Sequence, residues 1–224
     1  FLMSGNFAKQ TTVFPGDFRY KKDNIHLTAN HESENKKFRI SFSGGYTVQD
    51  NNQPYLDLTR DSRLLAPNAP ALYDANGNLN WQNNTFNNPL RHLNGKYSAL
   101  TYDLLANSVV SYNVLPNLEL KSAFGFTDLR HEESSTAPST IYNPALGIGT
   151  DNSILFLNNS GRQSWIVEPQ ANWTKSYGKA TVSLLAGGTF QNKTGNQIVH
   201  QALGFPSNSL IYNLAAASNV TITQ

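Results

Sequence analysis

Five side chains that could contact a ligand lie within one stretch of the sequence, residues 50–96. They are four aromatic residues and one arginine: Tyr55, Tyr73, Trp81, Phe86 and Arg91. Aromatic faces stack on the rings of a ligand, and arginine pairs with anionic groups. The same side chains could instead pack a long loop onto itself or against a neighbouring protein, because a large ordered loop needs a small core of its own. We therefore expect this segment to contact a ligand or a partner protein, with internal packing as the open alternative.

The segment that starts at Asp74 has the composition of a calcium loop but not its spacing. It reads Asp-Ala-Asn-Gly-Asn-Leu-Asn. An EF-hand loop needs glycine at its sixth position and glutamate at its twelfth, whereas here Gly77 is fourth and Thr85 is twelfth. The Asn76-Gly77 pair predicts a type I′ β-hairpin instead. Because the five histidines also lack the spacing of a zinc site, we predict no metal ion and no other cofactor.

The remaining motifs do not indicate an enzyme or a nucleic-acid-binding protein. The sequence has no glycine-rich phosphate loop and no G-x-S-x-G motif. It has no cysteine, which excludes a disulfide, a thiolate metal site and a thiolate nucleophile. The net charge of +2 comes without a basic stripe, so nucleic acid is not an expected partner. We predict that the chain has no catalytic activity of its own.

Apolar and polar residues alternate along several segments, and this is the strongest signal for secondary structure. Asn, Ser and Thr make up 65 of the 224 residues, which is unusual for a helical protein. A period of two puts alternate residues on opposite faces of a sheet. We expect one face to point to lipid and the other to a lumen. The lipid-facing set is Phe38, Ile40, Phe42, Val182, Leu184 and Ala186, and the lumen-facing set is Arg39, Ser41, Thr181 and Ser183.

The pattern predicts about seven long strands with aromatic residues near their ends. Strands are expected in residues 1–9, 20–31, 38–48, 97–113, 118–127, 164–174 and 180–191. The aromatic pairs at their ends are Phe38 and Tyr46, Tyr102 and Tyr112, and Trp165 and Trp173. Aromatic residues at both ends of long alternating strands are typical of a β-barrel with lipid outside and water inside.

Short turns alternate with long loops along the chain. Tight turns are expected at residues 33–36, 115–117 and 176–179, and long loops at 50–96, 133–160 and 192 to the end. Short turns on one rim and long loops on the other are the arrangement of a transmembrane β-barrel. The fold class predicted is therefore all-β, an antiparallel transmembrane β-barrel of which these residues form an incomplete part. A soluble or surface carbohydrate-binding β-sandwich is the alternative, because its strands also alternate.

Several strings in the long loops resemble one family of membrane transporters. Residues 66–81 read APNAPALYDANGNLNW and residues 88–90 read NPL; IYNP at residues 141–144 and GRQSWIVEP at 161–169 also match. These strings are similar to the middle of the barrel of SusC/RagA-family TonB-linked outer-membrane transporters. The resemblance runs through residues 1–224, and the family's plug, TonB-contacting segment and C-terminal barrel strands have no counterpart in them.

The resemblance implies a function that the alternation alone does not. It implies a location in the cell outer membrane and import of nutrients too large for porins, usually glycan or peptide fragments. It also implies a SusD-like surface lipoprotein as a lid, and a TonB complex that acts through the plug. The sequence itself does not identify the substrate.

Overall fold

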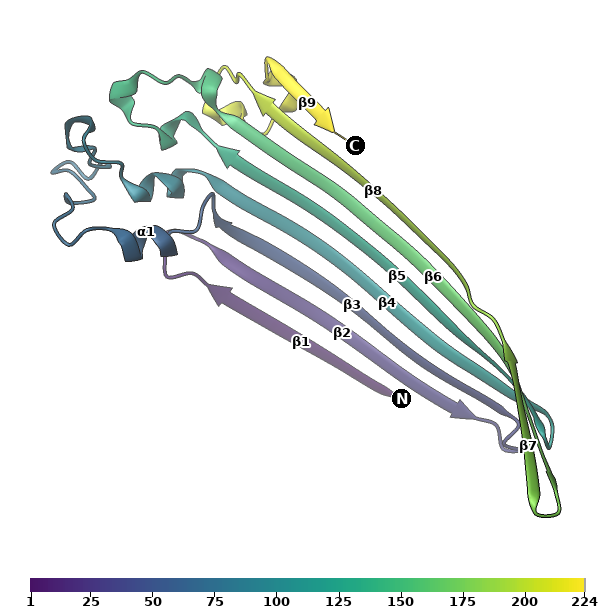
Figure 1. The fold of residues 1–224 in the computed structure, drawn as a ribbon. Helices are drawn as coiled ribbons and strands as arrows, with labels where there is room; N and C mark the ends of the chain where they lie inside the picture. Colours follow the sequence, from purple (N-terminus) through teal and green to yellow (C-terminus); the bar gives the residue numbers. More distant parts are fainter. Residues whose placement is uncertain (224) are drawn as a thin grey trace.

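The computed structural model describes residues 1–223, which form one antiparallel sheet of nine strands (Figure 1). Neighbours in sequence pair along the sheet in the order β1-β2-β3-β4-β5-β6-β8-β9, and β7 pairs with β6. The strands are β1 Leu2–Thr11, β2 Arg19–Glu32, β3 Phe38–Pro54, β4 Lys96–Leu115, β5 Leu118–Ala137, β6 Ile154–Tyr177, β7 Ala180–Gly187, β8 Phe190–Leu203 and β9 Asn219–Thr223. Within the described residues the sheet is not closed into a barrel.

β7 and β8 are one continuous strand whose pairing with β6 is interrupted at a proline. The register is the same on both sides of the interruption, because Gln170 pairs with Gly187 and Val167 pairs with Phe190. Between them, the N–H of Gly188 donates to the carbonyl of Pro169 at 3.1 Å. Proline has no N–H to return this bond, so the ladder loses one hydrogen bond at this point. The predicted strand at residues 180–191 therefore corresponds to β7 and the start of β8.

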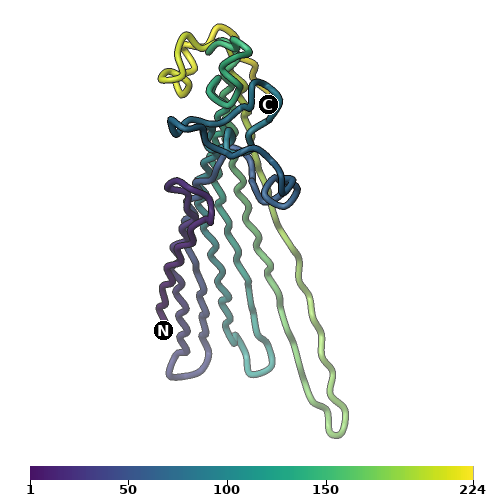
Figure 2. Tube along the Cα trace, turned by 90° about the vertical axis from the view of Figure 1, so that its left-hand side faces the viewer, coloured from purple at the N-terminus to yellow at the C-terminus, as the bar shows by residue number. Residues whose placement is uncertain are grey.

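Short turns occupy one rim of the sheet and long loops the other (Figure 2). The connections at residues 33–37, 116–117 and 178–179 form what we name the turn rim, and those at 12–18, 55–95, 138–153 and 204–218 form the loop rim. At the first turn, Lys36 takes a left-handed conformation with φ of 55°, and the N–H of Phe38 donates to Ser33 Oγ at 2.9 Å. The predicted separation of turns and loops is confirmed.

The loops contain only short helices, each of one or two turns. They are α1 Thr59–Leu64 and the 3₁₀ helices η1 Gln82–Asn84, η2 Pro89–Asn94, η3 Ser139–Ile141, η4 Pro144–Leu146, η5 Thr150–Asn152, η6 Asn208–Leu210 and η7 Leu214–Ala216. None of the helices in residues 1–223 is both long and apolar enough to span a lipid bilayer.

The strands extend further towards the loop rim than the sequence predicts, so the predicted bounds of the long loops are wrong. β3 continues to Pro54, β5 to Ala137 and β8 to Leu203, while β6 already begins at Ile154. In β3 and β5 these extensions carry polar residues on both faces, and β6 begins with four apolar residues in succession, Ile154 to Leu157. The alternation therefore disappears although the backbone ladder continues. The short strand β9 also lies inside the segment predicted as the last loop.

The strand register separates the side chains onto two faces, as predicted. Cross-strand partners share a face, and successive residues alternate between faces. We name one face the apolar face, because its half nearer the turn rim is almost entirely apolar. In that half it carries Ile25, Leu27 and Ala29; Phe38, Ile40, Phe42 and Tyr46; Leu104, Ala106, Val110 and Tyr112; Leu120, Phe124 and Phe126; Trp165, Val167, Ala171 and Trp173; and Val182, Leu184, Ala186 and Phe190. All six residues expected on one side are among these.

The opposite face, named the polar face, carries Arg39, Ser41, Thr181 and Ser183, as expected. Hydrogen bonds between side chains link neighbouring strands across it. Asn24 Nδ2 donates to Thr47 Oγ1 at 2.8 Å, and the hydroxyl of Tyr20 donates to Gln49 Oε1 at 2.7 Å. Such cross-strand pairs satisfy polar groups and fix the strand register.

The apolar face of the sheet is not covered by a second sheet. All strands of residues 1–223 belong to one sheet, and large side chains on the apolar face remain open, with Leu184 and Phe190 each 61% exposed. In a β-sandwich these side chains would pack across a dry core about 10 Å thick. The alternative prediction of a sandwich is therefore wrong for the described residues.

Replacing Pro169 with alanine should restore the missing ladder bond between β6 and the β7–β8 strand. The new N–H of residue 169 would donate to the carbonyl of Gly188, because these two residues already share the reverse bond. We expect this amide to exchange with deuterium as slowly as that of Ala171, which is paired with Ala186. Fast exchange at residue 169 beside slow exchange at residue 171 would show that the interruption has another cause.

Candidate binding cleft at the loop rim

The longest loop, residues 55–95, is folded around a buried asparagine. Asn88 has 0% of its surface exposed. Its Nδ2 donates to the carbonyls of Leu72 at 2.6 Å and Asn80 at 3.1 Å, and its Oδ1 accepts from the N–H of Leu90 at 3.0 Å. These bonds join three parts of the loop that are distant in sequence. A buried amide that is fully bonded in this way gives an irregular segment a defined conformation.

A small hairpin projects from this loop, where the sequence predicts a turn. Tyr73 and Leu79 form an isolated antiparallel bridge, and the N–H of Gly77 donates to the carbonyl of Asp74 at 3.0 Å. Gly77 has φ of 82°, but Asn76 is not among the residues with positive φ. A type I′ turn needs positive φ at both central residues, so the predicted turn type is wrong. The observed arrangement is a three-residue loop that ends in a left-handed glycine.

The carboxylate of Asp74 holds this hairpin together by accepting backbone hydrogen bonds. Its Oδ1 accepts from the N–H of Asn78 at 2.8 Å and from that of Asn76 at 2.9 Å. The bond from Asn78 is the main reason why the pKa of Asp74 lies below its ordinary value of 3.8. The side chain is therefore a fixed anion at neutral pH.

Three residues in succession after Trp81 adopt left-handed backbone conformations. Gln82, Asn83 and Asn84 have φ of 43°, 52° and 70°. Asparagine tolerates this region better than most residues, whereas glutamine adopts it only at a cost in conformational energy. The chain thereby reverses direction beside the indole, and the N–H of Phe86 donates back to the carbonyl of Trp81 at 3.3 Å.

A second loop, residues 138–153, packs beside the first. Asn94 Nδ2 donates to the carbonyl of Thr140 at 2.9 Å, and Asn143 Nδ2 donates to Asn84 Oδ1. The second loop is in turn tied to the third, because Ser153 Oγ donates to Asn208 Oδ1 at 2.6 Å. Under that third loop lies a small apolar core of Leu155, Ala202, Phe205 and Ile211. The loop rim is thus a connected layer and not a set of independent loops.

A cleft of about 730 Å³ opens between the first two loops. Its walls combine aromatic faces with amides, hydroxyls and a single carboxylate. It is lined by Asp74, Asn78, Leu79, Trp81 and Asn94 from the first loop, and by Ser139, Thr140, Tyr142, Asn143, Pro144, Ala145 and Ile148 from the second. Trp81 and Tyr142 can stack on a ring or an apolar chain, while the amides can donate and accept hydrogen bonds. The carboxylate among these side chains, that of Asp74, accepts hydrogen bonds from the backbone of its own hairpin.

The structure separates the five side chains that the sequence grouped together. Trp81 lines the cleft, and Tyr73, which is 50% exposed, stands on the adjacent hairpin. Phe86 is partly buried, and its N–H donates to the carbonyl of Trp81. Arg91 instead lines a separate cleft of about 260 Å³ with Asp61 and His92.

Tyr55 lies at the base of the loop, where internal packing explains it. Its N–H donates to the carbonyl of Gly95 at 3.2 Å, and its ring centroid lies 6.3 Å from that of His92. His92 is only 7% exposed, and burial lowers its pKa, with a further contribution from Arg91. A neutral histidine packed against tyrosine belongs to the small core of this loop.

The sequence did not identify the contribution of the second loop to the cleft. Tyr142 and Asn143 lie in the string Ile-Tyr-Asn-Pro, which the sequence offers only as part of a resemblance. Asn143 also caps η4, because its Oδ1 accepts from the N–H of Ala145 at 3.1 Å. An Asn-Pro pair that starts a helical turn in a long loop is therefore a signal that could have directed attention there.

Comparison with known proteins shows a similar fold among solved structures. No family model matches the chain, and no curated protein matches it. The RagAB peptide importer in its "closed-closed" state is similar with a TM-score of 0.68 and 15% identity, over 92% of this chain and 24% of that chain. The RagAB peptide transporter gives 0.69 and 14% over 92% and 25%, and the "open-open" state of the importer gives 0.69 and 15% over 92% and 24%. The chain spans about a quarter of the length of the chains it resembles, and at this identity the likeness concerns the fold.

Replacing Asn88 with alanine should loosen the long loop without affecting the sheet. The change removes three hydrogen bonds at a fully buried position. We expect local opening of residues 71–92 to become easier by about 2–4 kcal/mol, since each unpaired buried group costs about 1–3 kcal/mol. Hydrogen exchange of the loop amides measures this. Alanine at the neighbouring exposed Asn87 is the control, and equal effects of the two changes would show that the loop does not depend on the buried amide.

Acid should open the hairpin at Asp74. The pKa of this carboxyl is lower in the folded hairpin than in an open chain, because the N–H of Asn78 donates to the charged form. Its contribution to stability is complete above the ordinary value of 3.8 and is lost as pH falls through the folded pKa. Amide exchange at Gly77 should therefore accelerate below about pH 4 relative to exchange in an unstructured peptide. In Asp74→Asn, which keeps an acceptor oxygen but does not titrate, a remaining transition at this pH would assign it to another group.

Proposed function

We propose that this chain forms part of the wall of an outer-membrane β-barrel transporter that imports large nutrients, with the cleft at the loop rim contacting the substrate or a lid protein. The observation that carries the proposal is the apolar half of the apolar face, nearer the turn rim, on a single sheet of long strands. We name this half the apolar band. Supporting it is the likeness of the fold to a quarter of the RagAB peptide importer chain. Glycan or peptide fragments are the proposed cargo, a SusD-like surface lipoprotein is the proposed lid, and a TonB complex is the proposed energy source.

The apolar band has the height that a bilayer requires. On β3 it runs from Phe38 to Val48, and on β4 from Tyr102 to Tyr112. A transmembrane β-strand tilted by about 45° needs about 9–11 residues. Aromatic side chains stand at both margins, where their amphipathic rings fit the membrane interface. The band therefore suits direct contact with lipid.

The polar face suits a water-filled or protein-filled interior. Its hydrogen bonds continue from the turn rim to the loop rim, with Thr127 Oγ1 2.5 Å from Ser164 Oγ and Asn158 Nδ2 donating to Glu133 Oε2 at 3.0 Å. A lumen lined by Asn, Ser, Thr and Gln is compatible with passage of a hydrated, uncharged or zwitterionic solute. Neither the lumen face nor the cleft needs to perform chemistry on the solute, so the proposed activity is transport without catalysis.

Arginine substitutions at neighbouring positions of β3 test which face meets lipid. Ile40→Arg should destabilise the barrel in a lipid bilayer by about 2–4 kcal/mol if the site is near the midplane, because a charge on the lipid face is poorly solvated. Ser41→Arg adds the same side chain to the polar face and should cost much less. Unfolding by denaturant in lipid vesicles measures both values. Equal costs would contradict the assigned orientation.

Alanine at Trp81 tests the role of the cleft. We expect Trp81→Ala to weaken uptake of labelled oligosaccharides or oligopeptides, or association with the lid lipoprotein, by roughly fivefold or more while the barrel assembles normally. Tyr212→Ala is the matched control, because Tyr212 is also an exposed aromatic residue at the loop rim and does not line the cleft. Loss of barrel assembly in Trp81→Ala, or unchanged uptake and lid association, would remove the cleft from the proposal.

A further inference from the structure

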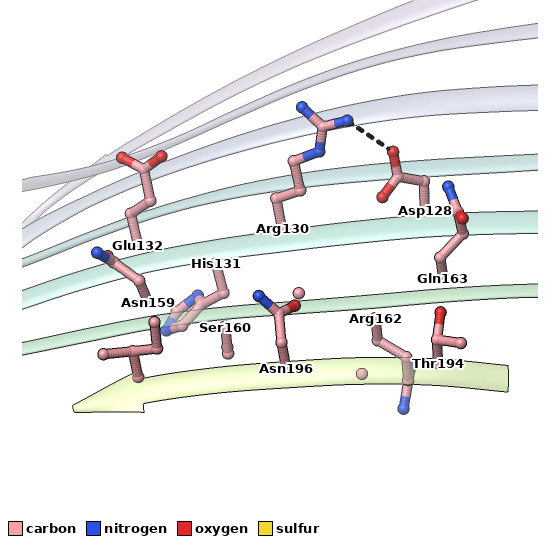
Figure 3. A pocket seen from close by; sticks show the side chains of 13 residues that line it. Asp128, Arg130, His131, Glu132, Asn159, Ser160, Arg162, Gln163, Thr194 and Asn196 are labelled. Atoms are coloured by element: carbon pink, nitrogen blue, oxygen red, sulfur yellow. Dashed lines mark hydrogen bonds and ion pairs between the residues drawn. The ribbon is translucent and has the colours of Figure 1, made fainter. Parts of the chain in front are cut away.

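A polar hollow lies on the apolar face, between the apolar band and the loop rim. Figure 3 shows the side chains that line it. It has a volume of about 620 Å³ and is formed on β5, β6 and β8. Its side chains on this face are Asp128, Arg130 and Glu132 on β5, Asn159, Gly161 and Gln163 on β6, and Thr194, Asn196 and Ile198 on β8. Neither the transport proposal nor the cleft at the loop rim uses these residues.

A glycine at the centre creates the hollow. Gly161 pairs with Arg130 on one side and with Asn196 on the other. A Cβ at this position would lie 2.8 Å from Asn196 Oδ1, so any larger side chain would occupy the space in front of the strand. The glycine therefore leaves a recess surrounded by longer polar side chains on the three strands.

The hollow is continuous with the apolar band below it. The last row of the band, in which Phe126 pairs with Trp165 and Trp165 with Asn192, lies directly beside the first row of the hollow, in which Gln163 pairs with Asp128 and Thr194. Further towards the turn rim, the same face has an apolar groove of about 740 Å³, lined in part by Phe124, Pro169 and Phe190. If the band meets lipid, the hollow lies at the level of the headgroups and the groove at the level of the acyl chains.

The chemistry of the hollow suits a neutral polyhydroxylated group. Arg130 Nη2 pairs with Asp128 Oδ2 at 3.0 Å, which leaves the carboxylate of Glu132 without a cationic partner among residues 1–223. The amides of Asn159, Gln163 and Asn196 can each donate and accept, as sugar hydroxyls do. The hollow is lined by two carboxylates, Asp128 and Glu132, and by two arginines, Arg130 and Arg162. These charges balance, so the hollow has no excess positive charge to hold a bare phosphate.

We propose that the polar hollow binds the sugar headgroup of a membrane glycolipid whose acyl chains lie along the apolar band. The amides and Glu132 hydrogen-bond the sugar hydroxyls, the recess at Gly161 admits the ring, and Trp165 marks the junction between headgroup and chains. This inference rests on the proposed membrane placement of the apolar face. The lipid-facing surface of the wall then selects one kind of lipid. This selectivity is separate from transport through the lumen.

The test uses the full-length protein in nanodiscs of phosphatidylcholine that contain a minor fraction of monogalactosyl diacylglycerol. Native mass spectrometry counts the galactolipid retained relative to phosphatidylcholine. Gly161→Val fills the recess, and the double variant Glu132→Ala with Asn159→Ala removes hydrogen-bonding groups without filling it. Gly45→Val is the matched control, because Gly45 lies on the polar face of β3, where a Cβ has room, and does not line the hollow.

We expect galactolipid retention to fall roughly fivefold or more in Gly161→Val and in the double variant, a factor that loss of about one net hydrogen bond produces. Retention should not change in Gly45→Val. Equal retention in the wild type and both test variants would overturn the proposal. Binding of soluble galactosylglycerol as strong as that of the galactolipid would overturn the assignment to a lipid, because the apolar band would then contribute nothing.

A second readout separates this inference from the proposed function. Brominated phosphatidylcholine quenches a tryptophan that lies at the acyl chains, and Trp165→Phe identifies the part of the signal that comes from this residue. Quenching of Trp165 without galactolipid preference would overturn the glycolipid site and leave the transporter proposal standing. Absence of quenching in the folded protein would contradict the membrane placement, and with it both proposals.

Discussion

The unbroken hydrogen-bond register of the sheet determines every other feature of this structure. From β2 to β6, and on into β7 and β8, each strand pairs with its neighbour without a slip, apart from one irregularity near the β4–β5 turn at Asn113 and Leu115. A slip of one residue would move every side chain of a strand to the other face. The separation into an apolar and a polar face therefore exists only because the register is kept over strands of up to 24 residues. Even Pro169, which removes one donor, leaves the register intact.

Although the strand register is kept along the whole sheet, the side chains divide the sheet into two zones. Near the turn rim one face is apolar and the other polar, and the aromatic residues at Tyr112 and Trp173 mark one margin of the apolar zone. Nearer the loop rim, polar residues stand on both faces, except where Leu155 and Ala202 form the small apolar core under the third loop. There the sheet continues as a support for the loops. The loops lack a large apolar core, so buried amides such as Asn88 and the hydrogen bonds between loops replace it. The cleft at Trp81 and the polar hollow at Gly161 both lie in this second zone.

The sequence predicted correctly which residues share a face wherever apolar and polar residues alternate. It did not predict the strands where alternate residues do not differ in polarity. Phe38 and Arg39 are placed on opposite faces correctly because apolar and polar residues alternate around them. The extension of β5 through Glu132 could not be predicted in this way, since polar residues stand on both faces there. Trp81 and Tyr142 line the same cleft from loops that are separated by two complete strands. The spacing of residues within one segment contains no information on which loops lie side by side. The hollow at Gly161 likewise depends on the register of three strands, which no single strand reveals.

Cysteine scanning along β6 tests the central claim most directly, because the sequence has no cysteine of its own. Spin labels placed singly from Leu155 to Tyr177 in the full-length protein in lipid vesicles would report contact with oxygen in the bilayer and with a nickel chelate in water. Our account predicts alternation with a period of two, with contact to lipid only at 165, 167, 169, 171 and 173, contact to water at both faces from 158 to 163, and little contact with either reagent at Leu155, which is buried under the third loop. Equal lipid contact at Trp165 and Ile166, or lipid contact that extends through Gly161 and Asn159, would contradict it.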